Sequence, residues 1–149
     1  MIIEHSLEIA APATVVWEVI TDLPSYPAWN PFVVACRSTL AVGAPIWMRV
    51  CIFPFWAQPQ RERIFTHAPG RVLCYGVRGM PLGSLVSCRH HQVRSLEAQR
   101  TLYESRFELG GWLAPLVQCL LGRRLARGFH AMTEAIRHRA EELESRRAS

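Results

Sequence analysis

The last stretch of the chain, Gly110 to Arg147, constrains the fold more than any other segment. Its apolar residues recur at steps of three and four, the spacing of one continuous stripe on an α-helix. A helix of some 34 residues would be about 50 Å long, and so long an amphipathic helix needs a large curved surface to lie against. The stripe consists of Trp112, Leu113, Leu116, Val117, Leu120, Leu121, Leu125, Phe129, Met132, Ile136 and Leu143.

The segments before this helix predict that surface. Residues Ile2 to Ile9 alternate between apolar and polar side chains, as in a half-buried strand, and a short helix follows Ala11-Pro12. Prolines at 24, 27 and 31 make Asp22–Phe32 a compact turn or helical corner. Six further strands are expected at Phe32–Thr39, Ile46–Phe53, Gln60–His67, Val72–Val77, Leu85–Val93 and Thr101–Leu109, with glycine and proline turns between them.

This order of elements predicts an α+β fold formed by residues 1–149 as a single domain. A curved antiparallel sheet of about seven strands would wrap around the long carboxy-terminal helix, with two short helices after the first strand. Successive hairpins alternate between the two ends of a meander, so three apolar turns should meet at one end. These turns predict a cavity mouth, unless they fold inward to plug the core. The mouth residues are Phe55, Trp56, Met80, Leu82 and Trp112.

Composition narrows the partners and the compartment. The net charge is +5, but arginines of the last helix have acidic partners at helical spacing, such as Arg137 and Glu141, which favours a solvated helix face over a nucleic-acid surface. The five cysteines contain no C-x-x-C pair, so neither a zinc nor a redox motif is predicted, and they indicate a reducing compartment. We find no signal peptide and no apolar run of ~18 residues, and therefore expect a cytoplasmic protein.

Several motifs resemble those of the SRPBCC (START-like, polyketide cyclase/dehydrase-type) superfamily. They are Ala11-Pro12, Val16-Trp17, the run Tyr26-Pro-Ala-Trp-Asn-Pro-Phe32, and Pro69-Gly-Arg-Val-Leu73. The resemblance implies a helix-grip fold with a deep cavity between the sheet and the last helix. Its members bind lipids, sterols, polyketides, quinones or other hydrophobic molecules, and a minority are enzymes. Many bacterial relatives carry an acidic residue on the last strand where this chain has Phe107, so we expect a more apolar cavity.

The expected cavity wall combines the sheet, the corner and the last helix. Strand alternation directs Tyr75 and Tyr103 toward the helix, where their hydroxyls would either orient a ligand or serve the core. His90 and His91 are adjacent and so cannot share one metal ion; we assign His90 to the cavity, with a surface histidine as the alternative. Trp29 and Phe32 pack the corner or line the cavity. The predicted ligand-binding set is Trp29, Phe32, Leu73, Tyr75, His90, Tyr103, Phe107, Leu116 and Leu120.

No catalytic signature accompanies this set. The chain lacks the motifs of zinc proteases, serine hydrolases, phosphate loops and dinucleotide sites, so we assign no catalytic residue, metal or cofactor. The predicted function is non-enzymatic binding or transport of a small hydrophobic ligand by a monomer or homodimer. One alternative is a polyketide cyclase or aromatase that uses His90 or Tyr103 as acid or base. Another is a quinone-binding accessory protein that contacts a membrane through Phe55, Trp56 and Trp112.

Overall fold

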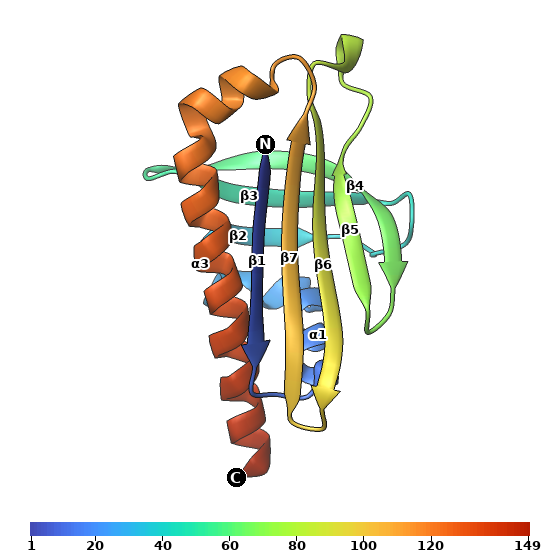
Figure 1. The fold of residues 1–149 in the computed structure, drawn as a ribbon, viewed down its shortest axis with the longest axis vertical. Coiled ribbons are helices and arrows are strands. Elements are labelled where there is room, and N and C mark those ends of the chain that lie inside the picture. The colour runs from blue at the N-terminus through green and yellow to red at the C-terminus, as the bar shows by residue number, and fades with distance from the viewer.

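The computed structural model describes residues 1–149 and contains one seven-stranded antiparallel sheet packed against a long helix (Figure 1). The strand order is β1-β7-β6-β5-β4-β3-β2, so β2 to β7 form a meander and β1 adds beside β7. The predicted helix-grip α+β fold is confirmed. The elements are β1 Ile2–Ile9, α1 Ala13–Thr21, α2 Tyr26–Trp29, β2 Val33–Arg37, β3 Pro45–Phe53, β4 Trp56–Ala68, β5 Val72–Val77, β6 Val86–Glu97, β7 Arg100–Gly110 and α3 Ala114–Ala148.

Strand alternation determines which side chains the sheet buries. Every second residue of β7 from Thr101 to Leu109 is buried, and the residues between them are more exposed. Strands β4 and β6 are longer than predicted because both hairpins pair almost to their turns, with Phe53 opposite Trp56 and Glu97 opposite Arg100. The buried set faces α3 and forms the concave side of the sheet.

The proline-rich corner after α1 is held by two polar side chains. The Asn30 side-chain oxygen accepts hydrogen bonds from the backbone N–H groups of Phe32 and Val33, at 3.0 and 2.9 Å. The buried Tyr26 hydroxyl donates to the Ile20 carbonyl at 2.6 Å, and Trp29 packs edge-on against the Tyr26 ring at 5.0 Å. These contacts turn the chain from α2 into β2 and place Phe32 inside the molecule.

Helix α3 covers the concave side of the sheet with one narrow apolar stripe. Leu125, Phe129, Met132 and Ile136 are buried, and α3 packs against α1, β1 and β3. The side chain of Phe32 packs so closely at Gly128 that a Cβ atom there would lie 2.2 Å from its ring. None of the helices combines the length and the apolar run needed to cross a membrane.

Candidate functional site: a cavity between the sheet and helix α3

A cavity of about 330 Å³ lies between the concave side of the sheet and α3. Its wall is formed by 21 residues, of which 15 are hydrophobic. Pockets for small organic ligands begin at about this volume and are mostly apolar with a few placed polar groups. The contribution of α3 to the wall is Val117, Leu121, Leu125 and Phe129.

An aromatic cluster forms part of this wall. The Phe129 ring meets Phe32 edge-on at 4.9 Å and Phe107 at 4.5 Å, centroid to centroid. These three rings come from α3, from the corner before β2 and from β7. Gly128 permits the cluster, since any larger residue would collide with the Phe32 ring.

One fully buried cation, Arg89 on β6, also lines the cavity. Only 2% of the residue is exposed, and its guanidinium carbon lies 4.4 Å from the centre of the Phe129 ring. Its Nη2 atom is 4.0 Å from the Met132 sulfur, a weak contact, and its Nε and Nη1 atoms have no hydrogen-bond partner. A buried charge without hydrogen bonds is unfavourable by several kcal/mol, about 3–5 when one partner of a pair is missing.

A carboxylic acid, Glu62 on β4, belongs to the same cavity. It stands opposite Ile46 of β3, in a row that continues through Gln60 and Gln58. Burial raises the pKa of the Glu62 carboxyl to about 7, and the positive charge of Arg89 partly opposes this rise. The cavity therefore combines the buried cation of Arg89, the exposed cation of Arg61 and one carboxyl group whose pKa lies near neutral pH.

A chain of three rings begins beside Arg89, at His91 on the same inward face of β6. The neutral His91 imidazole lies between two tyrosines, with Nε2 3.2 Å from the Tyr75 hydroxyl and Nδ1 2.7 Å from the Tyr103 hydroxyl. Burial, reinforced by the charge of Arg89, holds the pKa of His91 well below its usual value. One imidazole nitrogen donates and the other accepts. Only Tyr75 of the three rings reaches the cavity wall.

The structure brings some of the predicted ligand-binding residues to the cavity and places others elsewhere. Phe32, Tyr75 and Phe107 line it. Leu73 and Tyr103 are fully buried in the core outside its wall, and Trp29 lies half-buried against Tyr26. Their part in ligand binding remains a prediction.

Three assignments to the cavity need correction. On β6 the inward residues are Ser87, Arg89, His91 and Val93, so His90 faces outward. Leu116 and Leu120 are 55% and 67% exposed, because the buried stripe of α3 is narrower than the apolar pattern and runs through their neighbours Val117 and Leu121. The expected apolar cavity also proves to contain Arg89 and Glu62, which come from strands other than β7.

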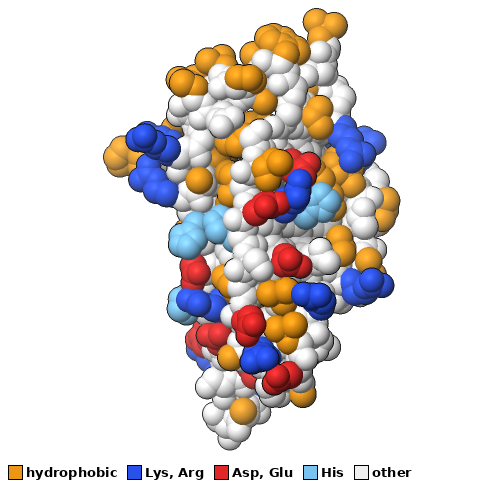
Figure 2. Space-filling model, viewed as in Figure 1, with side chains coloured by type: hydrophobic (Ala, Val, Ile, Leu, Met, Phe, Trp, Pro, Cys, Tyr) orange, Lys and Arg blue, Asp and Glu red, His pale blue; other side chains and the backbone are white.

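The predicted mouth residues lie on the surface at one end of the sheet. Phe55 and Leu82 are 99% and 92% exposed, and Trp56 and Trp112 are more than half exposed. Met80 is the member of this group that also lines the cavity. Figure 2 shows hydrophobic side chains gathered at this end, near the start of α3. They do not fold inward to plug the core.

Comparison with known protein families identifies the fold family. The model of a family described as "Polyketide cyclase / dehydrase and lipid transport" matches residues 1–141. The chain belongs to this family. The resemblance to the START-like superfamily is therefore confirmed, and a small hydrophobic ligand is what the family description leads us to expect. No curated protein matches the chain by sequence.

Solved structures of family-like fold include both enzymes and proteins named only by superfamily. The ZhuI aromatase/cyclase from Streptomyces sp. R1128 is 19% identical with a TM-score of 0.71, over 100% of this chain and 96% of that one. A START superfamily protein from Mycobacterium smegmatis is 19% identical with a TM-score of 0.70, over 95% and 98%. Norcoclaurine synthase from Thalictrum flavum is 19% identical with a TM-score of 0.67, over 95% and 94%. At these identities the likeness shows the fold alone.

Proposed function

We propose that this family member binds a small, mostly apolar molecule with an acidic head group in the cavity between the sheet and α3. The apolar wall favours a hydrocarbon or aromatic body. The observation that carries the proposal is Arg89, whose Nε and Nη1 atoms are buried in the cavity wall without hydrogen-bond partners. A carboxylate or a similar oxyanion at either edge of the guanidinium would accept from one of these nitrogens together with Nη2, in the planar, two-pronged geometry that guanidinium groups prefer.

The first experiment identifies the ligand and then tests its head group. Native mass spectrometry of freshly purified protein, followed by solvent extraction, should reveal a species bound near one to one. Isothermal titration then compares a medium-chain fatty acid with the alcohol of equal length. We expect the acid to bind at least about tenfold more tightly, since a charge-assisted hydrogen bond contributes roughly 1.5–3 kcal/mol.

A pair of arginine variants supplies the control. Arg89→Met removes the buried cation while keeping a long apolar side chain, and it should abolish the preference for the acid. Arg94→Met changes an exposed arginine on the same strand and should leave both affinities unchanged. Equal binding of acid and alcohol by the unmodified protein, or an intact acid preference in Arg89→Met, would contradict the acidic head group.

A second candidate function is catalysis of the cyclase or dehydratase type, and Glu62 is the observation that favours it. A carboxyl group with a pKa of about 7 is suited to exchange protons at neutral pH. It shares the cavity with Arg89, a cation able to stabilise a developing oxyanion. The decisive measurement is turnover of the identified ligand by the wild type and by Glu62→Gln. If Glu62→Gln loses turnover but still binds the ligand, the protein is an enzyme that uses Glu62. If the wild type leaves the ligand unchanged after prolonged incubation, the protein is a carrier.

A further inference from the structure

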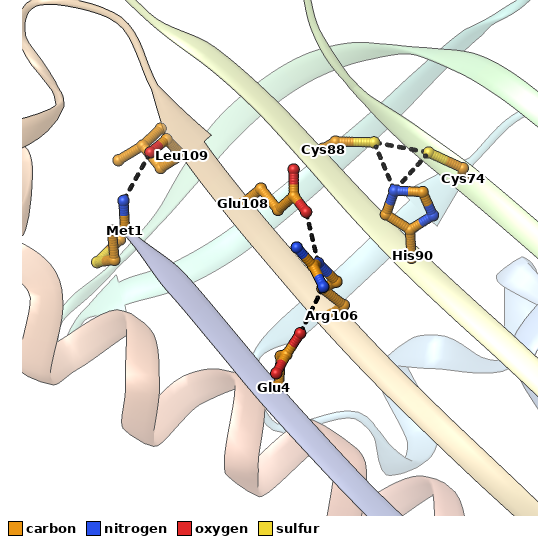
Figure 3. Close-up of polar contacts among 8 residues, drawn as sticks. All are labelled: Met1, Glu4, Cys74, Cys88, His90, Arg106, Glu108 and Leu109. Atoms are coloured by element: carbon orange, nitrogen blue, oxygen red, sulfur yellow. Dashed lines mark hydrogen bonds and ion pairs between the residues drawn. The ribbon is translucent and has the colours of Figure 1, made fainter.

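Two cysteines and a histidine converge on the face of the sheet opposite the cavity (Figure 3). Cys74 of β5 is directly opposite His90 of β6, and Cys88 precedes His90 by two residues on the same face. The Cys88 sulfur lies 3.2 Å from His90 Nε2, the Cys74 sulfur 3.7 Å from the same nitrogen, and the two sulfurs are 2.7 Å apart. Both thiols are free.

From this geometry we propose that Cys74, Cys88 and His90 form a binding site for a thiophilic d¹⁰ cation, with Zn²⁺ as the expected ion. Zn–S bonds of about 2.3 Å and Zn–N bonds of about 2.0 Å in a tetrahedron place sulfur and nitrogen about 3.5 Å apart. The two sulfur–nitrogen distances lie on either side of that value. Loading requires the sulfurs to separate by about 1 Å, a movement within reach of one side-chain torsion at half-exposed Cys88.

The donor set selects the class of metal. Two thiolates and an imidazole suit zinc or cuprous copper and do not suit magnesium or calcium, which prefer oxygen ligands. Cys74 is buried at the base of the cluster, whereas Cys88 and His90 are half-exposed, so an ion reaches the site from solvent. Three protein ligands leave a fourth coordination position.

The neighbouring strand supplies a carboxylate beside that position. Glu108 of β7 is the direct partner of Cys88, and it forms an ion pair with Arg106, which in turn pairs with Glu4 of β1 at 2.7 Å. Figure 3 shows these side chains on the same face as the cluster, and Figure 2 shows acidic, basic and histidine side chains side by side there. Glu108 is thus placed either as a fourth ligand or as an acceptor for a metal-bound water. Arg106 orients this carboxylate.

Cobalt substitution tests the site directly. Reduced, metal-free protein is titrated with Co²⁺, which reports tetrahedral thiolate coordination through its visible bands and a near-ultraviolet charge-transfer band. We expect one equivalent to bind with both signatures and to be displaced by Zn²⁺. Zn²⁺ should also slow the alkylation of Cys88 by iodoacetamide without slowing that of Cys119, an exposed cysteine on α3.

Variants assign the ligands. Cys88→Ser and His90→Gln should each weaken Zn²⁺ binding by more than the ~10–100-fold that loss of a second-shell contact costs. Cys119→Ser and His138→Gln change exposed residues on α3 and should bind like the wild type. Cys74 is buried, so Cys74→Ser is included only if its circular dichroism spectrum matches that of the wild type.

Three results would overturn the proposal. The first is that reduced protein takes up no stoichiometric Co²⁺ or Zn²⁺. The second is that metal uptake is unchanged in both Cys88→Ser and His90→Gln, and the third is a cobalt spectrum of oxygen-only coordination. A Cys74–Cys88 disulfide in protein isolated without reductant, combined with no metal uptake after reduction, would replace the metal site by a redox pair. Ligand binding in the cavity is measured separately, so failure of one proposal leaves the other untouched.

Discussion

Arg89 is a residue at which stability and binding oppose each other. Its neighbours in the structure, the Phe129 ring and the Met132 sulfur, satisfy packing and leave two buried nitrogens without hydrogen bonds. A core built only for stability would place an apolar side chain there, because an unpaired buried charge is unfavourable. A ligand that supplies the missing acceptors would recover that energy on binding.

The first prediction therefore concerns the unliganded protein. Arg89→Met should raise the free energy of unfolding by about 1–3 kcal/mol, because it removes an unsatisfied buried cation and keeps the apolar contacts. Urea denaturation of delipidated protein measures this, with Arg94→Met as the exposed control. A loss of stability in Arg89→Met would mean that the arginine serves the core.

The second prediction concerns the pH dependence created by Glu62. Its folded-state pKa of about 7 lies above the ordinary value of 4.5, so the folded protein keeps this proton to higher pH than the unfolded chain does. Stability must then fall as pH rises from about 4.5 to about 7. Relative to Glu62→Gln, the wild type should lose on the order of 1–3 kcal/mol across that window. Urea unfolding at pH 5, 6, 7 and 8 would detect it, and parallel curves for the two proteins would refute it.

At the scale of elements, the contact between α3 and the corner before β2 sets the shape of the cavity. Phe32 fits against the helix only because residue 128 is glycine. The same helix contains Gly122, where an added Cβ would meet neighbouring side chains at ordinary distances of 3.5 and 3.6 Å. The two glycines thus form a natural comparison within one helix.

The third prediction uses that comparison. Gly128→Ala should destabilise the protein by about 1–3 kcal/mol, because overpacking displaces the Phe32 ring. Gly122→Ala should stabilise it by about 0.5–1 kcal/mol through helix propensity. Thermal unfolding compares the two, and adding Phe32→Leu to Gly128→Ala should recover part of the loss. Destabilisation of equal size by both alanines would point to a cause other than the Phe32 contact.

The elements also show what the sequence can and cannot predict. Strand alternation correctly predicted that Tyr75 and Tyr103 face inward, and the proline spacing predicted the corner. The sequence pattern misplaced His90, because Arg89 is a charged residue at an inward position of β6 and such positions are usually apolar. Only the structure shows that Arg89 is buried. The apolar stripe of α3 included Leu116 and Leu120 because hydrophobicity alone does not separate a buried face from an exposed one. The Cys74–Cys88–His90 cluster escaped detection because its members meet across two strands.

At the scale of the whole molecule, the exposed apolar end of the sheet is compatible with two routes of ligand entry, from solution or from a membrane. Phe55 and Leu82 are almost fully exposed, and Leu82 follows the cavity residue Met80 by two residues in the turn between β5 and β6. Such a surface is suited to collecting a hydrophobic molecule, and it would also sit in the interface of a bilayer. Oligomeric state and membrane contact both remain predictions.

The fourth prediction tests this end of the sheet. Phe55→Ser combined with Leu82→Ser should reduce co-sedimentation with phosphatidylglycerol-containing liposomes several-fold and leave the melting temperature unchanged. Val42→Ser removes an exposed apolar residue from the opposite end, in the turn between β2 and β3, and should have no effect. If neither the wild type nor the variants sediment with liposomes, membrane contact is refuted. The cavity then receives its ligand from solution or from another protein.

The pairing of β1 with β7 has a consequence for biosynthesis. Ile2 pairs with Glu108 and Ile9 with Thr101, so β1 finds its neighbour only after β7, the last strand of the sheet, has been made. Until then the concave side of the sheet is uncovered as well, because α3 is translated after β7. The sheet must therefore remain open from the synthesis of β1 to that of β7, and a chaperone that shields β1 would act over that whole interval.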